Sequence, residues 1–151
     1  MNTRTTFYAL LGLLLTLGGC NQGSTSGVGF RLPDGDPEVG REVFLYMQCN
    51  QCHTIAGTQL PVINQSQPPF VELGGRVTMV KTYGELVTSI VNPSHKLAAG
   101  YAKDRVSDDG ESKMYTYNQH MTVQELIELV AFLQEQYDVV PPQFEYRIYP
   151  H

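Results

Sequence analysis

Two cysteines and a histidine in the first half of the chain have a spacing that suits covalent attachment of a cofactor. Cys49, Cys52 and His53 form a C-x-x-C-H run, which is typical of c-type haem attachment. Two thiols three residues apart on a helical turn can reach the two vinyl groups on one edge of a porphyrin and form thioethers. The adjacent histidine then lies under the iron as its proximal ligand. The run therefore predicts one covalently bound haem c.

Two other chemistries could use the same side chains. A zinc site on Cys49, Cys52 and His53 needs a fourth ligand, and the sequence has neither a second cysteine pair nor an H-x-x-x-H run. A thioredoxin-like dithiol would follow a strand within a βαβ frame, which the sequence pattern does not indicate. Covalent haem is the interpretation that these residues favour.

The first 19 residues are typical of an export signal. Arg4 is followed by an apolar run from residue 7 to residue 17 that is too short to span a bilayer as a stable helix. The run ends in Leu-Gly-Gly-Cys20, which resembles a bacterial lipobox, although an ordinary signal peptide containing a cysteine is the alternative. Lipidated Cys20 would hold the protein at the periplasmic side of a bacterial membrane, inner or outer.

The remaining composition limits the partners. Lipid on Cys20 and haem on Cys49 and Cys52 account for all three cysteines of the chain. Residues 20–35 are rich in Gly, Ser and Thr and predict a flexible tether. The chain has 10 Lys and Arg against 15 Asp and Glu, and one of the ten is Arg4 in the predicted signal. We therefore expect basic or mixed-charge protein partners and no nucleic acid.

Three segments have the start and stop signals of helices. Asp36 followed by Pro37 predicts a first helix, and residues 83–91 predict a second that ends at Asn92-Pro93. The last helix is predicted over residues 122–137, where Thr122-Val-Gln-Glu forms a capping box before a stripe of apolar residues. No run alternates cleanly between apolar and polar residues, so the pattern predicts an all-α domain of helices and loops.

The chain resembles the class I cytochrome c family over most of residues 36–137. Gly40 and Phe44 precede the haem motif as a Gly-x-x-x-aromatic pattern does in that family, and residues 129–133 (Leu-Val-Ala-Phe-Leu) resemble its C-terminal helix. The resemblance implies three to four helices wrapped around one haem. It also implies that Leu129 and Phe132 meet Gly40 and Phe44 where the terminal helices cross. Residues 138–151 would form an extended C-terminal tail.

The resemblance further implies that a methionine sulfur is the sixth ligand of the iron. In the family this sulfur comes from the loop before the last helix, and Met114 lies in such a loop, at residues 112–118. The family commonly has proline after this methionine, and Tyr115 stands there instead.

Other side chains compete less well for that position. Met121 precedes the capping box and could pack on Leu126 as a hydrophobic staple. His120 would give a lower-potential bis-histidine haem, but a lone loop histidine is more often solvated. Of the remaining methionines and histidines, Met47 is assigned to the core, Met79 comes too early in the chain, and His95 and His151 are read as solvated.

Two further residues are assigned by the resemblance alone. Pro68 aligns with the proline whose carbonyl accepts the second ring N–H of the ligating histidine. The glycine that normally precedes this proline is replaced by Gln67. Arg76 aligns with a basic residue that often meets a haem propionate, and an ordinary surface arginine is the alternative.

These observations predict an electron carrier and not an enzyme. With His53 and Met114 both bound, the iron has no open position, so we expect redox partner proteins and no small-molecule substrate. Two alternatives remain at this point. One is a haem c ligand-binding or sensor protein with a labile sixth ligand, and the other is a fixed electron-transfer subunit of a larger respiratory enzyme.

Overall fold

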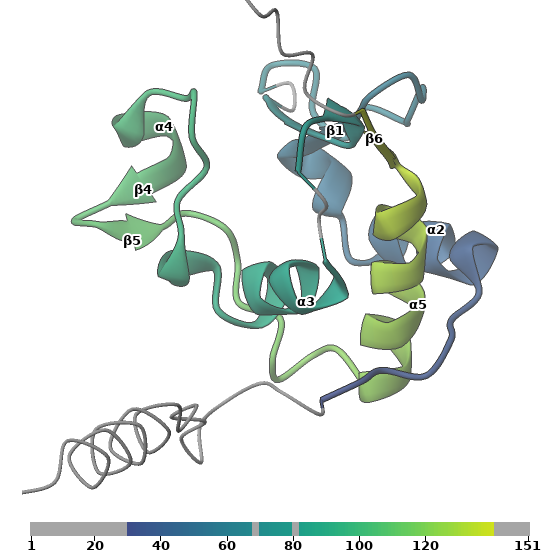
Figure 1. Ribbon diagram of the computed structural model, residues 1–151. Coiled ribbons are helices and arrows are strands. Elements are labelled where there is room, and N and C mark those ends of the chain that lie inside the picture. Colours follow the sequence, from purple (N-terminus) through teal and green to yellow (C-terminus); the bar gives the residue numbers. More distant parts are fainter. Residues whose placement is uncertain (1–29, 68–69, 80–81, 141–151) are drawn as a thin grey trace, which may run out of the picture. The chain divides into compact units, whose positions relative to one another are not determined.

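The computed structural model describes residues 30–67, 70–79 and 82–140 (Figure 1). The chain divides into two compact units, Met1–Arg31 and Leu32–His151, and the helices and strands below all belong to the second. The predicted signal, the lipidation site Cys20, Pro68 and residues 141–151 of the predicted tail lie outside the described residues. In the part of the chain that is described, no helix has the length and apolar character needed to cross a membrane.

The first helix of this unit, α2 (Pro37–Tyr46), begins as predicted. The Asp36 carboxylate accepts the N–H of Glu38 at 2.9 Å, and Pro37 occupies the first turn, where a missing N–H costs nothing. The packed part of the chain starts slightly earlier than this cap. Leu32 packs against the core, and the Asp36 N–H donates to the carboxylate of Glu128.

The last helix, α5 (Val123–Glu135), crosses α2 at very close range. A Cβ on Gly40 would lie 2.0 Å from the Glu128 carbonyl oxygen and 2.7 Å from the Cβ of Phe132. The rings of Phe44 and Phe132 meet edge to face, with centroids 5.7 Å apart, a favoured aromatic geometry. Leu129 is buried in the same core cluster. The predicted crossing of the two terminal helices is confirmed.

A third helix, α3 (Tyr83–Val91), packs against α5. The Thr82 hydroxyl accepts the N–H of Glu85 at 3.2 Å, while the Glu85 carboxylate accepts the N–H of Thr82 at 3.1 Å, which makes a capping box. The helix ends at the predicted residue, because Pro93 cannot continue it. The core lies between these three helices, and its buried side chains are Val43, Phe44, Ile55, Leu86, Val87, Ile90, Leu129, Val130, Phe132 and Leu133.

The all-α prediction is wrong, because six short strands among the described residues pair into three two-stranded sheets. Strand β1 (His53–Ile55) pairs in parallel with β2 (Val71–Leu73), and β3 (Gly75–Val77) pairs in parallel with β6 (Tyr137–Val139). Strand β4 (Ser107–Asp108) pairs antiparallel with β5 (Glu111–Ser112). The fold is therefore mixed, with four α-helices and these strands among the described residues.

The sequence pattern does not predict these strands, for a physical reason. Each is two or three residues long, which is too short for alternation of apolar and polar residues to be visible. Strand β6 also takes residues that the apolar stripe assigned to the last helix, which ends at Glu135 and not at Tyr137.

Three short helical elements remain among the described residues. The 3-10 turn η1 (Cys49–Gln51) carries the first cysteine, η2 (Pro93–His95) follows α3, and α4 (Lys103–Val106) leads into β4 (Figure 1).

Candidate functional site

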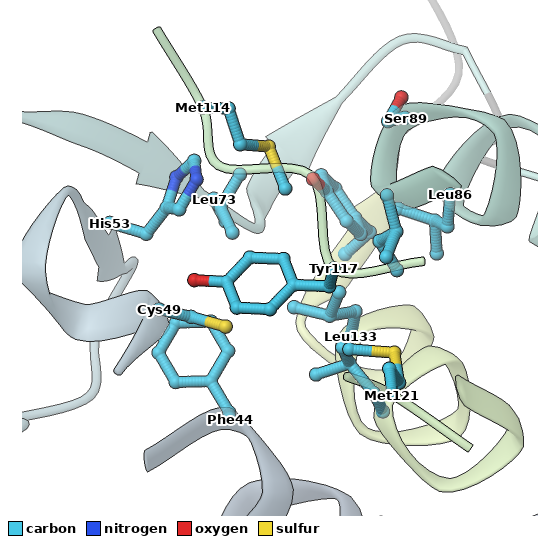
Figure 2. A pocket seen from close by; sticks show the side chains of 13 residues that line it. Phe44, Cys49, His53, Leu73, Leu86, Ser89, Met114, Tyr117, Met121 and Leu133 are labelled. Atoms are coloured by element: carbon cyan, nitrogen blue, oxygen red, sulfur yellow. The ribbon is translucent and has the colours of Figure 1, made fainter. Parts of the chain in front are cut away.

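An apolar cavity lies beside the C-x-x-C-H run (Figure 2). Its empty space is about 530 Å³, a figure that includes open solvent at its mouth. Its walls come from α2, η1, β1, β2, α3, α5, β6 and the loop before α5. The lining residues are Phe44, Cys49, His53, Leu73, Leu86, Ser89, Ile90, Met114, Tyr117, Met121, Leu129, Leu133 and Tyr137.

The two cysteines share one tight turn but face different surroundings. Gln48 adopts the left-handed conformation, with φ at 58°, so the chain leaves α2 and enters η1. The N–H of Cys52 donates to the carbonyl of Cys49 at 3.2 Å. Cys49 is half-buried and lines the cavity, whereas Cys52 is exposed. The predicted helical turn is present, and one of its thiols points to the interior side of the site.

The environment of Cys49 disfavours thiolate chemistry. Burial raises the pKa of the Cys49 thiol to about 11, and hydrogen bonds from its own backbone and from Tyr117 offset only part of this. A thiol that stays protonated at neutral pH is a poor nucleophile for disulfide exchange. A thioredoxin-like dithiol also follows a strand, and here helix α2 precedes the motif.

His53 begins strand β1 and lines the same cavity. Burial lowers the pKa of its imidazole, and the nearby Val71 backbone only partly opposes this. The ring is therefore neutral near pH 7, which is the form that binds metals. Its Nδ1 is buried and makes no hydrogen bond of normal geometry with any described residue. Ligating histidines normally donate this N–H to a partner, and the predicted partner, Pro68, lies outside the described residues.

Met114 lies on a loop that crosses the cavity, and we call residues 112–118 the Met114 loop. The Met114 N–H donates to the Ser112 hydroxyl at 3.1 Å, and the Lys113 N–H donates to the Val106 carbonyl at 2.9 Å. Figure 2 shows the Met114 side chain extending into the cavity that His53 also lines. The structure thus brings the predicted proximal and sixth ligands to one cavity.

A second methionine also reaches this cavity. Met121 lines it and packs against the core together with Leu126, so a structural role and a ligand role are both open to its sulfur. Met47 packs against the core, as predicted, from the residue after α2. Met79 is 74 % exposed.

Three predicted or alternative site residues lie away from the cavity lining. His120 is exposed and stacks on Tyr115, with ring centroids 5.8 Å apart. The Nδ1 of His95 is 2.8 Å from the Asn92 carbonyl oxygen. Arg76 is exposed on β3, and its Nε lies 4.0 Å from a carboxylate oxygen of Asp138. The structure does not bring the Arg76 guanidinium into the cavity.

The sequence analysis did not select two residues at or next to the site: Tyr117 lines the cavity, and Asn50 lies within the C-x-x-C-H run. The Tyr117 hydroxyl donates to the Met47 carbonyl at 3.0 Å, and burial raises the pKa of Tyr117 to about 12. Asn50 is only 3 % exposed, and its side-chain amide donates to the Pro61 carbonyl at 2.8 Å. An aromatic residue in a polar loop was a signal for Tyr117. No sequence signal distinguishes Asn50 from its neighbour Gln51.

Among the residues that the structure describes, no three His, Cys, Asp or Glu side chains group as a metal site of their own. Comparisons of the chain with protein-family models, with curated proteins and with solved structures found no match.

The lining nevertheless fits a covalent haem. A porphyrin needs an apolar cavity, a thiol at its edge and axial donors from the chain. Cys49 provides the thiol, His53 an imidazole nitrogen, and Met114 or Met121 a thioether sulfur. Cys52 is exposed and is not among the lining residues, so the second attachment point would lie on the solvent side of Cys49.

Proposed function

We propose that this protein is a one-electron carrier with a single covalent haem c on Cys49, Cys52 and His53. The observation that carries the proposal is the apolar cavity in which Cys49, His53 and Met114 come together. The C-x-x-C-H run in the sequence independently indicates covalent haem attachment. Haem bound between an imidazole and a thioether supplies a one-electron couple whose potential the protein adjusts through its ligands and burial.

Four residues have a defined role in this proposal. The Cys49 and Cys52 thiols would hold the haem as thioethers, and adding each S–H across a vinyl double bond would need no oxidant. His53 is held neutral by burial and offers a ring nitrogen to the iron. Met114 would supply a thioether sulfur as a further iron ligand, which would leave no place for a substrate.

The partner is a redox protein that docks at the mouth of the cavity. Cys52, the second proposed attachment residue, is exposed to solvent, and redox partners commonly meet over small transient interfaces. With 15 acidic and 10 basic residues, the chain favours a basic or mixed-charge partner whose association weakens as salt rises. Export and lipidation at Cys20 would restrict this encounter to a membrane surface outside the cytoplasm.

Absorption spectra of the haem-loaded protein, ferric and ferrous, with and without carbon monoxide, test the function. We expect haem that stays with the chain under denaturing conditions, a low-spin spectrum, the weak methionine-to-ferric-iron band and no reaction with carbon monoxide. Replacing Cys49 and Cys52 with serine should abolish covalent attachment. A parent chain that carries no covalent haem after maturation refutes the proposal.

Three methionine variants identify the sixth ligand. Met114→Ala should lose the methionine band and bind carbon monoxide, whereas Met121→Ala and Met79→Ala should keep the band. Met79 is the matched control, because it is 74 % exposed and outside the cavity lining. Loss of the band in Met121→Ala alone would move the ligand to Met121. Ready binding of carbon monoxide by the parent would favour a ligand-binding or sensor protein instead.

A further inference from the structure

The Met114 loop is tied to the rest of the protein by side-chain hydrogen bonds of two kinds. At its start, the Ser112 N–H donates to the Ser94 hydroxyl at 3.0 Å, and near its end the Asn118 amide donates to the Val91 carbonyl at 2.8 Å. The first bond leads to η2, and the second leads to the C-terminal residue of α3. They hold the loop to one wall of the cavity only.

Tyr117 makes a hydrogen bond that leads to a different part of the protein. Its hydroxyl donates to the Met47 carbonyl at 3.0 Å, across 70 residues of sequence. Met47 is the C-cap of α2, two residues before Cys49, so this bond reaches the opposite wall, which carries the haem motif. The same hydroxyl also interacts with the Cys49 thiol. Figure 2 shows the Tyr117 ring extending toward Cys49 and His53.

The backbone of Tyr117 is fixed as firmly as its hydroxyl. Its carbonyl accepts the N–H of His120 at 2.8 Å and the N–H of Met121 at 2.9 Å, just before α5 begins. One residue, three positions after Met114, therefore links the start of α5 to the end of α2. When this link is present, the Met114 loop cannot swing away from the haem motif without breaking a partly buried hydrogen bond.

We propose that Tyr117 is a positioning residue that keeps the Met114 loop closed and so keeps Met114 on the iron. This inference rests on the proposed function, because it concerns the sixth ligand of a bound haem. Tyr117 acts through Met114 and does not itself bind the iron. Its hydroxyl sets how often the sixth position opens to an external ligand.

The size of the effect follows from the strength of one hydrogen bond. A net contribution of about 1 kcal/mol corresponds to about a five-fold change in an equilibrium constant. Removing the hydroxyl should therefore raise the fraction of protein with an open loop about five-fold. An external ligand that binds only the open form then gains affinity by the same factor.

Titration of the ferric, haem-loaded protein with imidazole measures this fraction. Tyr117→Phe keeps the ring and removes the hydroxyl, and its apparent Kd for imidazole should fall about five-fold. Tyr115→Phe is the matched control, since Tyr115 is 57 % exposed and its ring contacts that of Tyr117 at 5.0 Å between centroids. The Kd of Tyr115→Phe should equal that of the parent. Denaturation midpoints of both variants separate loop opening from loss of the whole fold.

The outcomes keep the inference and the function apart. Covalent haem is measured on the parent first, and its absence refutes the proposed function and this inference together. If the parent carries haem and Tyr117→Phe binds imidazole as the parent does, the inference alone is overturned. A second measurement needs no variant, because NMR of the parent should show a slowly exchanging Tyr117 hydroxyl proton. A rapidly exchanging hydroxyl at that position also overturns the inference.

Discussion

The crossing of α2 with α5 and the Met114 loop on the other side of the cavity are held together in different ways. At the crossing, backbone meets backbone at Gly40, and the buried rings of Phe44 and Phe132 fill the space beside it. The Met114 loop is instead held by separate hydrogen bonds, among them those from the Asn118 and Tyr117 side chains to backbone carbonyls.

These two regions contribute differently to global stability and to local motion. Close packing of apolar surface supplies most of the free energy of folding, and it tolerates little change. Separate hydrogen bonds supply about 1 kcal/mol each, and they can open one at a time. The helix crossing thus fixes the frame, while the loop that carries Met114 can move without unfolding that frame.

The largest effect is expected where the two helices touch. Gly40→Ala would place a Cβ 2.0 Å from the Glu128 carbonyl oxygen, so the helices must move apart at a cost of about 3 kcal/mol or more. Gly84→Ala in α3 is the control, because the nearest atom to its Cβ is 3.9 Å away. That variant should lose no stability and can gain up to about 1 kcal/mol. Urea denaturation followed by circular dichroism measures both, and equal midpoints would contradict the close crossing.

A smaller effect is expected at the residue that joins the two regions. The Thr122 hydroxyl accepts the Glu125 N–H at 3.2 Å and caps α5 directly after the segment that carries Met114 and Met121. Thr122→Ala should reduce the free energy of unfolding by about 1 kcal/mol. Thr122→Ser retains the hydroxyl and should lose less than about 0.5 kcal/mol. The same loss in both variants would mean that the methyl group, and not the cap, matters.

The loop region predicts a change that is local. Asn118→Ala removes the bond that an exposed side chain makes to the Val91 carbonyl. The free energy of global unfolding should therefore change by less than about 0.5 kcal/mol. Amide hydrogen exchange in residues 112–121 should nevertheless rise about five-fold, as expected for the loss of about 1 kcal/mol in a local opening. Unchanged exchange in this segment would show that the loop does not open independently of the helices.

The smallest expected effect depends on pH. Hydrogen bonds from the Thr122 backbone and side chain lower the pKa of Glu125 below its ordinary value of 4.5. Its stabilising contribution is therefore present above pH 4.5 and is lost as the pH falls through the lowered pKa. The free energy of unfolding of the parent should exceed that of Glu125→Gln by less than about 0.5 kcal/mol at pH 7, because the carboxylate is exposed to solvent. Denaturation at pH 7 and pH 3 should show this difference closing, and a difference that grows on acidification would contradict the assignment.

The packed region was the easier one to predict from the sequence. A glycine four residues before Phe44, a capping box at Thr122 and a helix stop at Pro93 are local signals, and each of them has the predicted structural result. A second capping box, from Thr82 to Glu85, was equally visible in the sequence and was not used. Local chemistry decides helix ends, so a sequence reveals them.

The rest of the site depends on contacts between distant residues. Nothing near Tyr117 in the sequence indicates that its hydroxyl pairs with Met47. Arg76 lies where the pairing of β3 with β6 puts it, beside Asp138 and away from the cavity. That pairing forms between two three-residue strands from distant parts of the chain, and short strands of this kind leave no periodic pattern.

The contact between Asp36 and Glu128 joins residues 92 positions apart in the chain, so it can form only after α5 has been synthesised. A chain that leaves a ribosome or a translocon from its N-terminus presents Cys49, Cys52 and His53 long before α5 exists. Long-range contacts of this kind also form late and slowly when a chain folds. The wall with the haem motif therefore has no opposite wall until the last helix has emerged. Under the proposed function, the two thiols would be accessible for covalent attachment during that interval, and the arrival of α5 would then close the cavity.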